Sequence, residues 1–453
     1  MRELLRETAD LAADYLESLP ERPVFPSVDL EALRARLGGP VPEAATDPRE
    51  VVAELAAAGG EAAVGMAGGR YFGFVIGGAL PAALAADWLT SAWDQNAGLY
   101  VGGPAASVVE EVAGAWVAQL LGLSRARSFA FVTGTQMAHA TALAAARNHV
   151  LEREGWDVER DGLAGAPPIH VLAGTKAHST LYRALRLVGL GTACVVPVAV
   201  DDEGRMEADA LREALAAGEG PAIVCAQAGE VNTGAFDPFE AIADAAEEAG
   251  AWLHVDGAFG LWAAVSPRFA HLTRGAERAD SWSVDAHKWL NVPYDSGIAL
   301  CAHPEAHRRA MGVHAEYLVH ADEGGPRDQM DWTPEFSRRA RGFAVYAAIR
   351  SLGRAGIAAL IERCCDHAAR FARAVPATGA EVLNEVVLNQ VLFRYETDER
   401  TVEVLRRVQG SGEAWMSGTV WQERQAIRLS VSNWQTSDED VDRTLAAFAA
   451  AAA

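Results

Sequence analysis

Lys288 is the first residue whose type invites a chemical interpretation. The chain contains 39 lysine and arginine residues, and only two of them, Lys176 and Lys288, are lysines. A lysine amine can lose its proton and attack a carbonyl carbon, whereas an arginine guanidinium stays protonated. Lys288 follows a histidine in the stretch SVDAHKWLNVPYDSG. The scarcity of lysine favours a nucleophilic amine at this position over the alternative, a surface lysine near a turn.

Two further stretches carry groups that suit the same site. In FVTGTQMAHA, Gly134 and Thr135 stand between an expected strand and an expected helix, where backbone N–H groups and the helix dipole bind anions. In WLHVDGAFG, Asp256 ends an apolar strand, at the carboxyl edge where open parallel sheets bind ligands. Taken alone, each could simply cap the following segment. Together with Lys288 they supply an anion site, a carboxylate and an amine, which pyridoxal 5'-phosphate (PLP) needs.

The elements that position these residues alternate along the chain. Short apolar runs begin at about residue 128, and most are separated by helical or turn segments; they are SFAFV, IHVLAG, TACVVPV, AIVCAQA, AWLHVDG, SWSVD and GIALCA. Strands that are apolar on both faces predict an α/β fold with a mainly parallel sheet and helices on both faces. We expect a helical, dimer-docking arm over 1–60, a large domain over 61–335 and a small α+β domain over 336–453.

Composition narrows the class of protein. The chain has 453 residues and is 50% hydrophobic, which is typical of a globular protein with a large core. Its net charge of -22 argues against a nucleic-acid or anionic-membrane partner, because both need a basic face. The five cysteines lack CxxC spacing, acidic residues from Glu3 onward argue against a signal peptide, and no charge-free apolar run reaches about 18 residues. These features predict a cytoplasmic protein.

Several motifs resemble those of the PLP-dependent group II amino-acid decarboxylases, a fold-type I family that includes aromatic-L-amino-acid and glutamate decarboxylases. HVDGAFG resembles the family's His-Val-Asp-Ala-Ala-Tyr-Gly stretch, and DAHKW is similar to its Asn-Pro-His-Lys-Trp. KAHSTLYRA is similar to the segment with the ring-stacking histidine, GPAASVVEEVAGAW to a helix near the dimer interface, and HAEYLVH to the mobile loop with the catalytic tyrosine. The resemblance runs from about residue 70 to the C-terminus.

The resemblance implies roles for particular residues around PLP. Lys288 would form the Schiff base, and Asp256 would hold the pyridine nitrogen protonated. Ala258 would lie against one face of the ring and His178 against the other. The residues implied around the phosphate are Gly134, Thr135, Asp285 and His287. No metal is implied.

The resemblance also implies a reaction and an assembly. The expected enzyme decarboxylates an L-amino acid to the amine through a quinonoid intermediate, and Tyr317 or His178 helps to return a proton to Cα. Tyr317 would lie on a loop contributed to the partner's site in a homodimer with shared active sites. The alternative is other PLP chemistry on the same scaffold, such as decarboxylation with oxidative deamination to an aldehyde, or aldol or transfer chemistry. A cofactor-free structural protein is disfavoured because Lys288, Asp256 and His178 are all present.

Two departures from the family pattern leave the substrate open. Gly229-Glu230-Val231 replaces a Gly-Thr-Thr run, so a threonine expected beside the cofactor is missing and an acid stands next to its place. Gly69-Arg70 replaces the family's His-Pro before two aromatic residues. An aromatic substrate is suggested by aromatic residues in the regions expected to line the pocket, which are Tyr71, Phe72, Phe74, Trp93 and Tyr100. Aromatic residues in such stretches also serve as core.

Overall fold

The described part of the chain forms two compact units. The computed structural model describes residues 1–313 and 325–453, and Tyr317 lies outside these ranges. The larger unit contains Ala79–Ala369 and Asn384–Val391. The smaller unit contains Met1–Gly78, Arg370–Leu383 and Leu392–Ala453. This grouping differs from the three consecutive segments expected from sequence, because both ends of the chain contribute to one unit.

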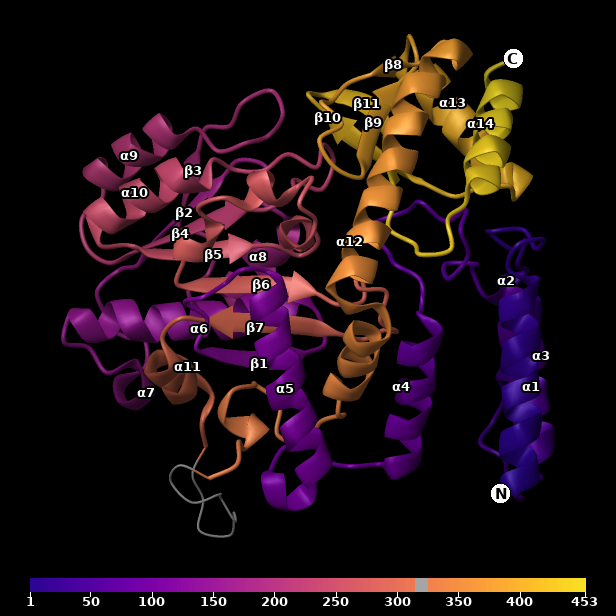
Figure 1. Cartoon of the computed structure of the whole chain (residues 1–453), viewed down its shortest axis with the longest axis horizontal. Coiled ribbons are helices and arrows are strands. Elements are labelled where there is room, and N and C mark those ends of the chain that lie inside the picture. The colour runs from indigo at the N-terminus through magenta and orange to yellow at the C-terminus, as the bar shows by residue number, and fades with distance from the viewer. Residues whose placement is uncertain (314–324) are drawn as a thin grey trace. The chain divides into compact units, whose positions relative to one another are not determined.

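Seven strands form the sheet of the larger unit, in the order β1-β7-β6-β5-β4-β2-β3 (Figure 1). Their bounds are β1 Ser128–Val132, β2 His170–Gly174, β3 Val195–Val198, β4 Ala222–Gln227, β5 Trp252–Asp256, β6 Ser281–Asp285 and β7 Gly297–Cys301. Strand β7 runs antiparallel to both of its neighbours, whereas β3, β2, β4, β5 and β6 pair in parallel. Each strand falls within an apolar run predicted from sequence, and the mainly parallel α/β sheet is confirmed.

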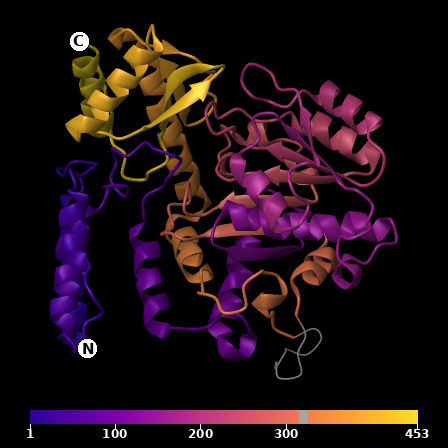
Figure 2. The ribbon, with the colours of Figure 1, turned by 180° about the vertical axis from the view of Figure 1, so that it is seen from behind.

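Helices cover both faces of this sheet. The helices of the larger unit are α4 Pro81–Trp93, α5 Pro104–Leu120, α6 Thr135–Arg153, α7 Val158–Asp161, α8 Ser179–Leu187, α9 Ala208–Ala217, α10 Phe239–Ala249, α11 Pro304–Met311 and most of α12, Gly342–Ala374. Figure 1 shows α5 on the near side of the sheet, and Figure 2 shows α6 and α8 on the opposite side. The expectation that the strands are covered on two faces is therefore met.

Helix α6 lies at the centre of the core because nearly all of its sides are apolar or small. Leu143 and Leu151 of α6 are fully buried in a cluster that includes Leu185 of α8 and Trp252 of β5. The many alanines let the helix lie close to the sheet, since a short side chain keeps the two backbones near each other. The first turn of α6 is thereby held at the end of β1, next to the carboxyl ends of the parallel strands.

The smaller unit combines N-terminal helices with a second sheet. Its helices are α1 Arg2–Ser18, α2 Leu30–Leu37, α3 Pro48–Ala62, α13 Asp398–Ser411 and α14 Asp438–Ala452. The second sheet has the order β10-β11-β9-β8, with bounds β8 Glu381–Val382, β9 Gln390–Arg394, β10 Ser417–Trp421 and β11 Arg424–Ser430. Tyr71 stacks on Trp415 with ring centroids 5.1 Å apart, and Phe72 packs edge-on against Phe371 at 5.3 Å. These aromatic residues are core residues of the smaller unit.

Helix α12 is interrupted within its length. Gly353 has φ 60° and ψ 176°, which is not helical, so the segment bends there. Within the described residues, the stretch Gly342–Thr378 is long and apolar enough to cross a membrane by length and composition alone. The core helix of a soluble protein meets the same criterion. This helix therefore neither supports nor contradicts the expectation that the chain has no membrane span.

Candidate active site

A cavity of about 250 Å³ in the larger unit gathers the predicted site residues. All eight residues assigned to cofactor binding from sequence line it: Gly134, Thr135, His178, Asp256, Ala258, Asp285, His287 and Lys288. Asp256 ends β5 and Asp285 ends the neighbouring strand β6, so both carboxylates lie at the carboxyl edge of the sheet. The eight residues that the sequence predicts for one site therefore line one cavity in the fold.

Lys288 is held by the carboxylate that ends β6. Its Nζ atom lies 3.0 Å from Oδ2 of Asp285, and its side chain is 22% exposed. The backbone N–H of Asp285 donates to the carbonyl of Ala258, and the indole N–H of Trp262 donates to the carbonyl of Asp285. These bonds fix the loop after β6, and they place the only amine on the cavity wall among the described residues.

The N-terminus of α6 forms the anion-binding side of the cavity. The backbone N–H of Thr135 donates to Oδ1 of Asp285 at 2.7 Å, which puts a carboxylate at the positive end of the helix. Gly297 of β7 lets the backbones approach, because a Cβ atom there would lie 2.4 Å from Cα of Gly134. Burial would raise the pKa of Asp285, but Lys288, His287 and the Thr135 bond hold it below its usual range.

His287 lines the same cavity, beside Asp285 and the N-terminus of α6. The backbone N–H of Ser296 donates to Nδ1 of His287 at 3.1 Å, so in the neutral ring the proton is on Nε2. Nε2 lies 3.5 Å from Oδ1 of Asp285, and the ring stacks on Tyr294 with centroids 4.2 Å apart. Burial lowers the pKa of His287, which favours this neutral form.

Asp256 is held as an ionised carboxylate. Its Oδ1 accepts the backbone N–H of Ala258 at 3.0 Å, and its Oδ2 lies 3.2 Å from Nε2 of His139. Burial alone would raise the pKa of Asp256, but His139, His178 and Lys288 together hold it well below its usual range. An ionised acceptor on a buried strand end is suited to bind a protonated ring nitrogen.

His178 has a defined orientation as well. It caps the N-terminus of α8, with the backbone N–H of Thr180 donating to its Nδ1 at 3.4 Å and the Thr180 hydroxyl 2.8 Å from the same atom. Because Nδ1 accepts the N–H, the neutral ring carries its proton on Nε2. Thr180 was not singled out from sequence, although its position two residues after a candidate histidine is the signal for a capping contact.

Glu230, the acid next to the place of the missing threonine, is engaged within its own turn. Its carboxylate accepts the backbone N–H groups of Asn232 and Thr233 at 2.6 and 2.8 Å and the side-chain amide of Asn232 at 2.9 Å. It therefore closes the turn after β4 and does not line the cavity. Val231 lines the cavity at this point, so an apolar side chain stands near the place of the missing threonine. Burial raises the pKa of Glu230.

The remaining lining residues were not assigned a role from sequence; they are Gln136, Thr180, Gln227, Gly229, Val231 and Phe259. Gly229 has φ 95°, and a Cβ there would lie 2.7 Å from the ring of Phe259, so this pair packs only with glycine. Within the described residues, none of the five aromatic residues expected to line a substrate pocket lines this cavity. The candidate catalytic residue Tyr317 lies outside the described residues.

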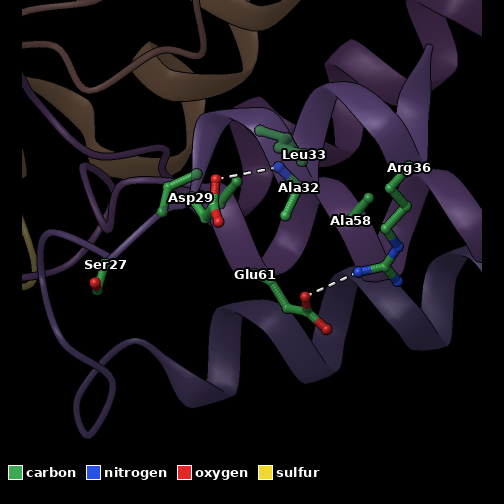
Figure 3. A pocket seen from close by; sticks show the side chains of 9 residues that line it. Ser27, Asp29, Ala32, Leu33, Arg36, Ala58 and Glu61 are labelled. Atoms are coloured by element: carbon green, nitrogen blue, oxygen red, sulfur yellow. Dashed lines mark hydrogen bonds and ion pairs between the residues drawn. The ribbon is translucent and has the colours of Figure 1, made fainter.

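Another cavity, of about 170 Å³, lies between α2 and α3 in the smaller unit (Figure 3). Its charged groups are already engaged in the local structure. Asp29 caps α2 by accepting the backbone N–H of Ala32 at 3.1 Å, and Arg36 pairs with Glu61 at 2.9 Å. This cavity lacks the amine and the histidines of the larger unit's cavity, so we place the chemistry in the latter.

The cavity of the larger unit fits PLP. The hydroxyl of Thr135 is buried and has no hydrogen-bond partner among the described residues, so it is available for a ligand oxygen. The helix N-terminus, the Nε2–H of His287 and the Thr135 hydroxyl form a set of donors for a phosphate. Asp256 supplies an acceptor for a ring nitrogen, and Lys288 supplies an amine for an aldehyde.

Comparison with known proteins agrees with this fit. The pyridoxal-dependent decarboxylase conserved domain matches residues 70–396. Aromatic-L-amino-acid decarboxylase from Bacillus atrophaeus is 28% identical over 97% of this chain and 93% of its own length. The 4-hydroxyphenylacetaldehyde synthase of Rhodiola rosea is 29% identical over 75% of this chain and 72% of its own length.

A solved structure shows the same fold with the cofactor. The structure of Oryza sativa TDC with PLP and tryptamine superposes with a TM-score of 0.93 at 27% identity, covering 100% of this chain and 97% of that one. The family match spans most of the chain and includes every residue that lines the cavity of the larger unit. The chain belongs to the pyridoxal-dependent decarboxylase family and is a PLP-dependent carboxy-lyase that acts on an amino acid.

Proposed function

We propose that the protein decarboxylates an aromatic L-amino acid to the corresponding amine, with PLP bound at Lys288. The observation that carries the proposal is the meeting of Lys288, Asp256 and His178 on one cavity beside the N-terminus of α6. The aromatic substrate is supported by the names of the Bacillus atrophaeus relative and of the ligand in the Oryza sativa structure. PLP, when bound, supplies an electron-accepting ring that stabilises negative charge at Cα after carbon dioxide leaves.

Lys288 would hold the cofactor covalently, and Asp285 would assist it. The Asp285 carboxylate lies 3.0 Å from Nζ of Lys288, so it keeps the amine pointed into the cavity before the cofactor is attached. The ion pair also offsets the negative charge of Asp285 close to the side that would bind the phosphate. Thr135 and His287 would donate to the phosphate from the α6 end.

Asp256 and His178 would act on the ring and on the substrate. Asp256 would keep the ring nitrogen protonated, because its own carboxylate is held ionised by His139, His178 and Lys288. His178 would lie against the ring with Nε2–H as its donor, since Thr180 engages Nδ1. A donor of this kind can orient a substrate carboxylate or supply a proton at Cα. Ala258 offers the small side chain that leaves room on the other face.

Tyr317 is proposed as the group that decides between amine and aldehyde. The proposal rests on the resemblance of HAEYLVH to the family's catalytic loop. The second candidate function, decarboxylation with oxidative deamination to an aldehyde, is favoured by the similarity to the Rhodiola rosea 4-hydroxyphenylacetaldehyde synthase. Replacing Tyr317 with Phe removes only the hydroxyl, so amine release should fall, while oxidation by dissolved dioxygen, which is reduced to peroxide, and hydrolysis by water should yield more aldehyde and ammonia. An unchanged amine rate with no aldehyde would remove Tyr317 as the proton donor.

A screen of the twenty amino acids tests the whole proposal. The purified protein loaded with PLP is supplied with each amino acid, and carbon dioxide, amine, aldehyde and peroxide are measured. We expect carbon dioxide and amine in equal amounts, with the highest rates on tryptophan, tyrosine or phenylalanine. Aldehyde and peroxide from the parent enzyme would establish the second candidate, and turnover of only small polar amino acids would contradict the aromatic assignment.

We also propose a homodimer with shared active sites. Helix α1 has no buried residue, and the exposed fractions of Leu5 and Leu11 on it are 57% and 40%. In the larger unit, the exposed fractions of Trp88 and Trp93 on α4 are 45% and 48%. Apolar side chains of this size on helices are typical of faces that become covered in an assembly. If Tyr317 acts in the partner's site, mixing Lys288→Ala and Tyr317→Phe protein under exchange conditions should restore amine formation; no recovery would contradict shared sites.

A further inference from the structure

A continuous line of buried polar side chains leads away from Asp256 into the core of the larger unit. Nε2 of His139, on α6, lies 3.2 Å from Oδ2 of Asp256. Nδ1 of His139 lies 2.8 Å from Nε2 of His254, on β5. Both histidine side chains are 0% exposed. Two adjoining histidines in a core are costly to bury unless their nitrogens are hydrogen-bonded.

The line continues to the neighbouring strand. Nδ1 of His254 lies 2.8 Å from the hydroxyl oxygen of Ser281, on β6, and the indole N–H of Trp252 donates to that oxygen at 2.9 Å. The hydroxyl of Ser283 lies 3.3 Å from Nδ1 of His139. The line Trp252–Ser281–His254–His139–Asp256 therefore joins one helix and two strands, and every member is buried except the carboxylate that reaches the cavity.

The direction of the protons along this line follows from its ends. An ionised carboxylate only accepts, so the direction is set from Asp256: Nε2 of His139 carries the proton that faces Oδ2, and Nδ1 of the neutral His139 ring accepts from Nε2 of His254. His254 is neutral, because burial and the neighbouring His139 lower its pKa to about 3. Its one proton is therefore on Nε2, so its Nδ1 accepts from the Ser281 hydroxyl, whose oxygen also accepts the indole N–H of Trp252. Among the described residues Nε2 of His139 makes no aligned hydrogen bond, and its ion-pair contact is Oδ2 of Asp256 at 3.2 Å.

We propose that His139 and His254 are positioning residues, and that the line Trp252–Ser281–His254–His139 fixes an N–H on Oδ2 of Asp256 so that the carboxylate stays ionised and correctly turned toward the cofactor. The inference rests on the proposed role of Asp256 as the partner of the ring nitrogen. Asp256 is then held from two sides, by His139 at Oδ2 and by the Ala258 N–H at Oδ1.

The first test is the protonation pattern of the rings in the full chain, measured with and without PLP. In protein labelled with ¹⁵N only in histidine, nitrogen chemical shifts separate a protonated ring nitrogen from a bare one. His139 and His254 should each carry one proton, on Nε2, and the His139→Leu variant assigns the His139 signals by their loss. A bare Nε2 on His139 overturns the proposal, because that nitrogen would then have no proton to donate to Asp256.

The second test is the affinity for PLP, which separates positioning from packing. His139→Leu should weaken PLP binding by about tenfold or more, since a hydrogen bond to a charged group is lost. The matched control is His307→Gln, another buried histidine with two partners, Ser128 and the carbonyl of Trp332, that does not touch Asp256. This control should bind PLP within about twofold of the parent, as expected for a site without shared partners.

A double variant with both substitutions tests whether His139 affects PLP affinity through Asp256. If His139 acts through Asp256, adding His139→Leu to Asp256→Asn should change PLP affinity by no more than about twofold. The full tenfold loss in that background would mean that His139 only packs, which overturns the proposal. If Asp256→Asn alone binds PLP like the parent, the proposed role of Asp256 fails and the function of the line fails with it. If Asp256→Asn weakens PLP binding and His139→Leu does not, the positioning role of His139 and His254 is wrong, while the proposed role of Asp256 stands.

Discussion

Lys288 and Asp256 reach one cavity from the ends of adjacent strands, which makes single substitutions informative. Lys288→Ala should lose turnover and the covalent pyridoxyl group, while the phosphate side around Thr135 still retains some PLP. Borohydride reduction followed by peptide mapping locates the group. The other lysine provides the control: Lys176→Arg should keep the pyridoxyl group at Lys288. A pyridoxyl group on Lys176 in the parent would contradict the assignment.

Asp256→Asn changes a charge with almost no change in shape. The amide cannot keep the ring nitrogen protonated as the ionised carboxylate does, so turnover should fall by about a hundredfold, which corresponds to roughly 3 kcal/mol in the barrier. The variant should still bind PLP, but more weakly than the parent. The measurement is steady-state kinetics at saturating PLP. Parental turnover would mean that another acid partners the ring.

At the scale of elements, the site depends on how closely β7 passes the start of α6. Gly297→Ala would put a Cβ atom 2.4 Å from Cα of Gly134, so the strand or the helix start must move. We expect a loss of about 1–3 kcal/mol in the free energy of unfolding, together with weaker PLP binding. Thermal unfolding and PLP titration measure the two effects.

Gly410 of α13 is the matched control for that substitution. A Cβ atom at Gly410 would have no atom within 4 Å, and no positive φ is recorded for this residue. Gly410→Ala should therefore stabilise the helix by up to about 1 kcal/mol and leave PLP affinity unchanged. Equal losses in the two variants would show that the close approach of β7 to Gly134 is not what shapes the site.

The strands and the cofactor side of the site could be predicted from the sequence, whereas the polar contacts behind them could not. Runs such as AIVCAQA are apolar on both faces, and parallel strands present their carboxyl ends together, so Asp256 and Lys288 had to lie close. The orientation of Glu230 was not predictable, because its carboxylate is used by two N–H groups of its own turn. His139 could not be predicted as a site residue for another reason: a histidine within an alanine-rich helix carries no periodic signal.

At the scale of the whole molecule, the ends of the chain were assigned to separate domains but share one unit. Tyr71 stacks on Trp415, and the guanidinium of Arg70 donates to the carbonyl of Glu413 at 2.5 Å and to the carbonyl of Pro20 at 2.8 Å. The contacts with Trp415 and Glu413 join segments at opposite ends of the sequence. Composition and periodicity describe each segment separately, so they cannot show which distant segments will pack together.

Buried histidines should also set the acid stability of the molecule. Burial lowers the pKa of both His254 and His307 to about 3, from an ordinary value of 6.5. The unfolded chain binds protons at these residues as the pH falls below 6.5, but the folded chain does not, so their contribution to stability is complete above 6.5 and is lost toward about 3. Within that window, each histidine should lower the free energy of unfolding by about 1.4 kcal/mol for each unit by which the pH falls.

His307→Gln isolates one of these contributions, because glutamine can hydrogen-bond but does not titrate. Its unfolding midpoint should fall less steeply than that of the parent as the pH is lowered from 6.5. The difference between the two proteins should grow by about 2 kcal/mol for a fall of about 1.5 pH units. Carboxylates and His254 titrate in both proteins and cancel in the comparison. Parallel curves for parent and variant would mean that His307 becomes protonated within the folded protein.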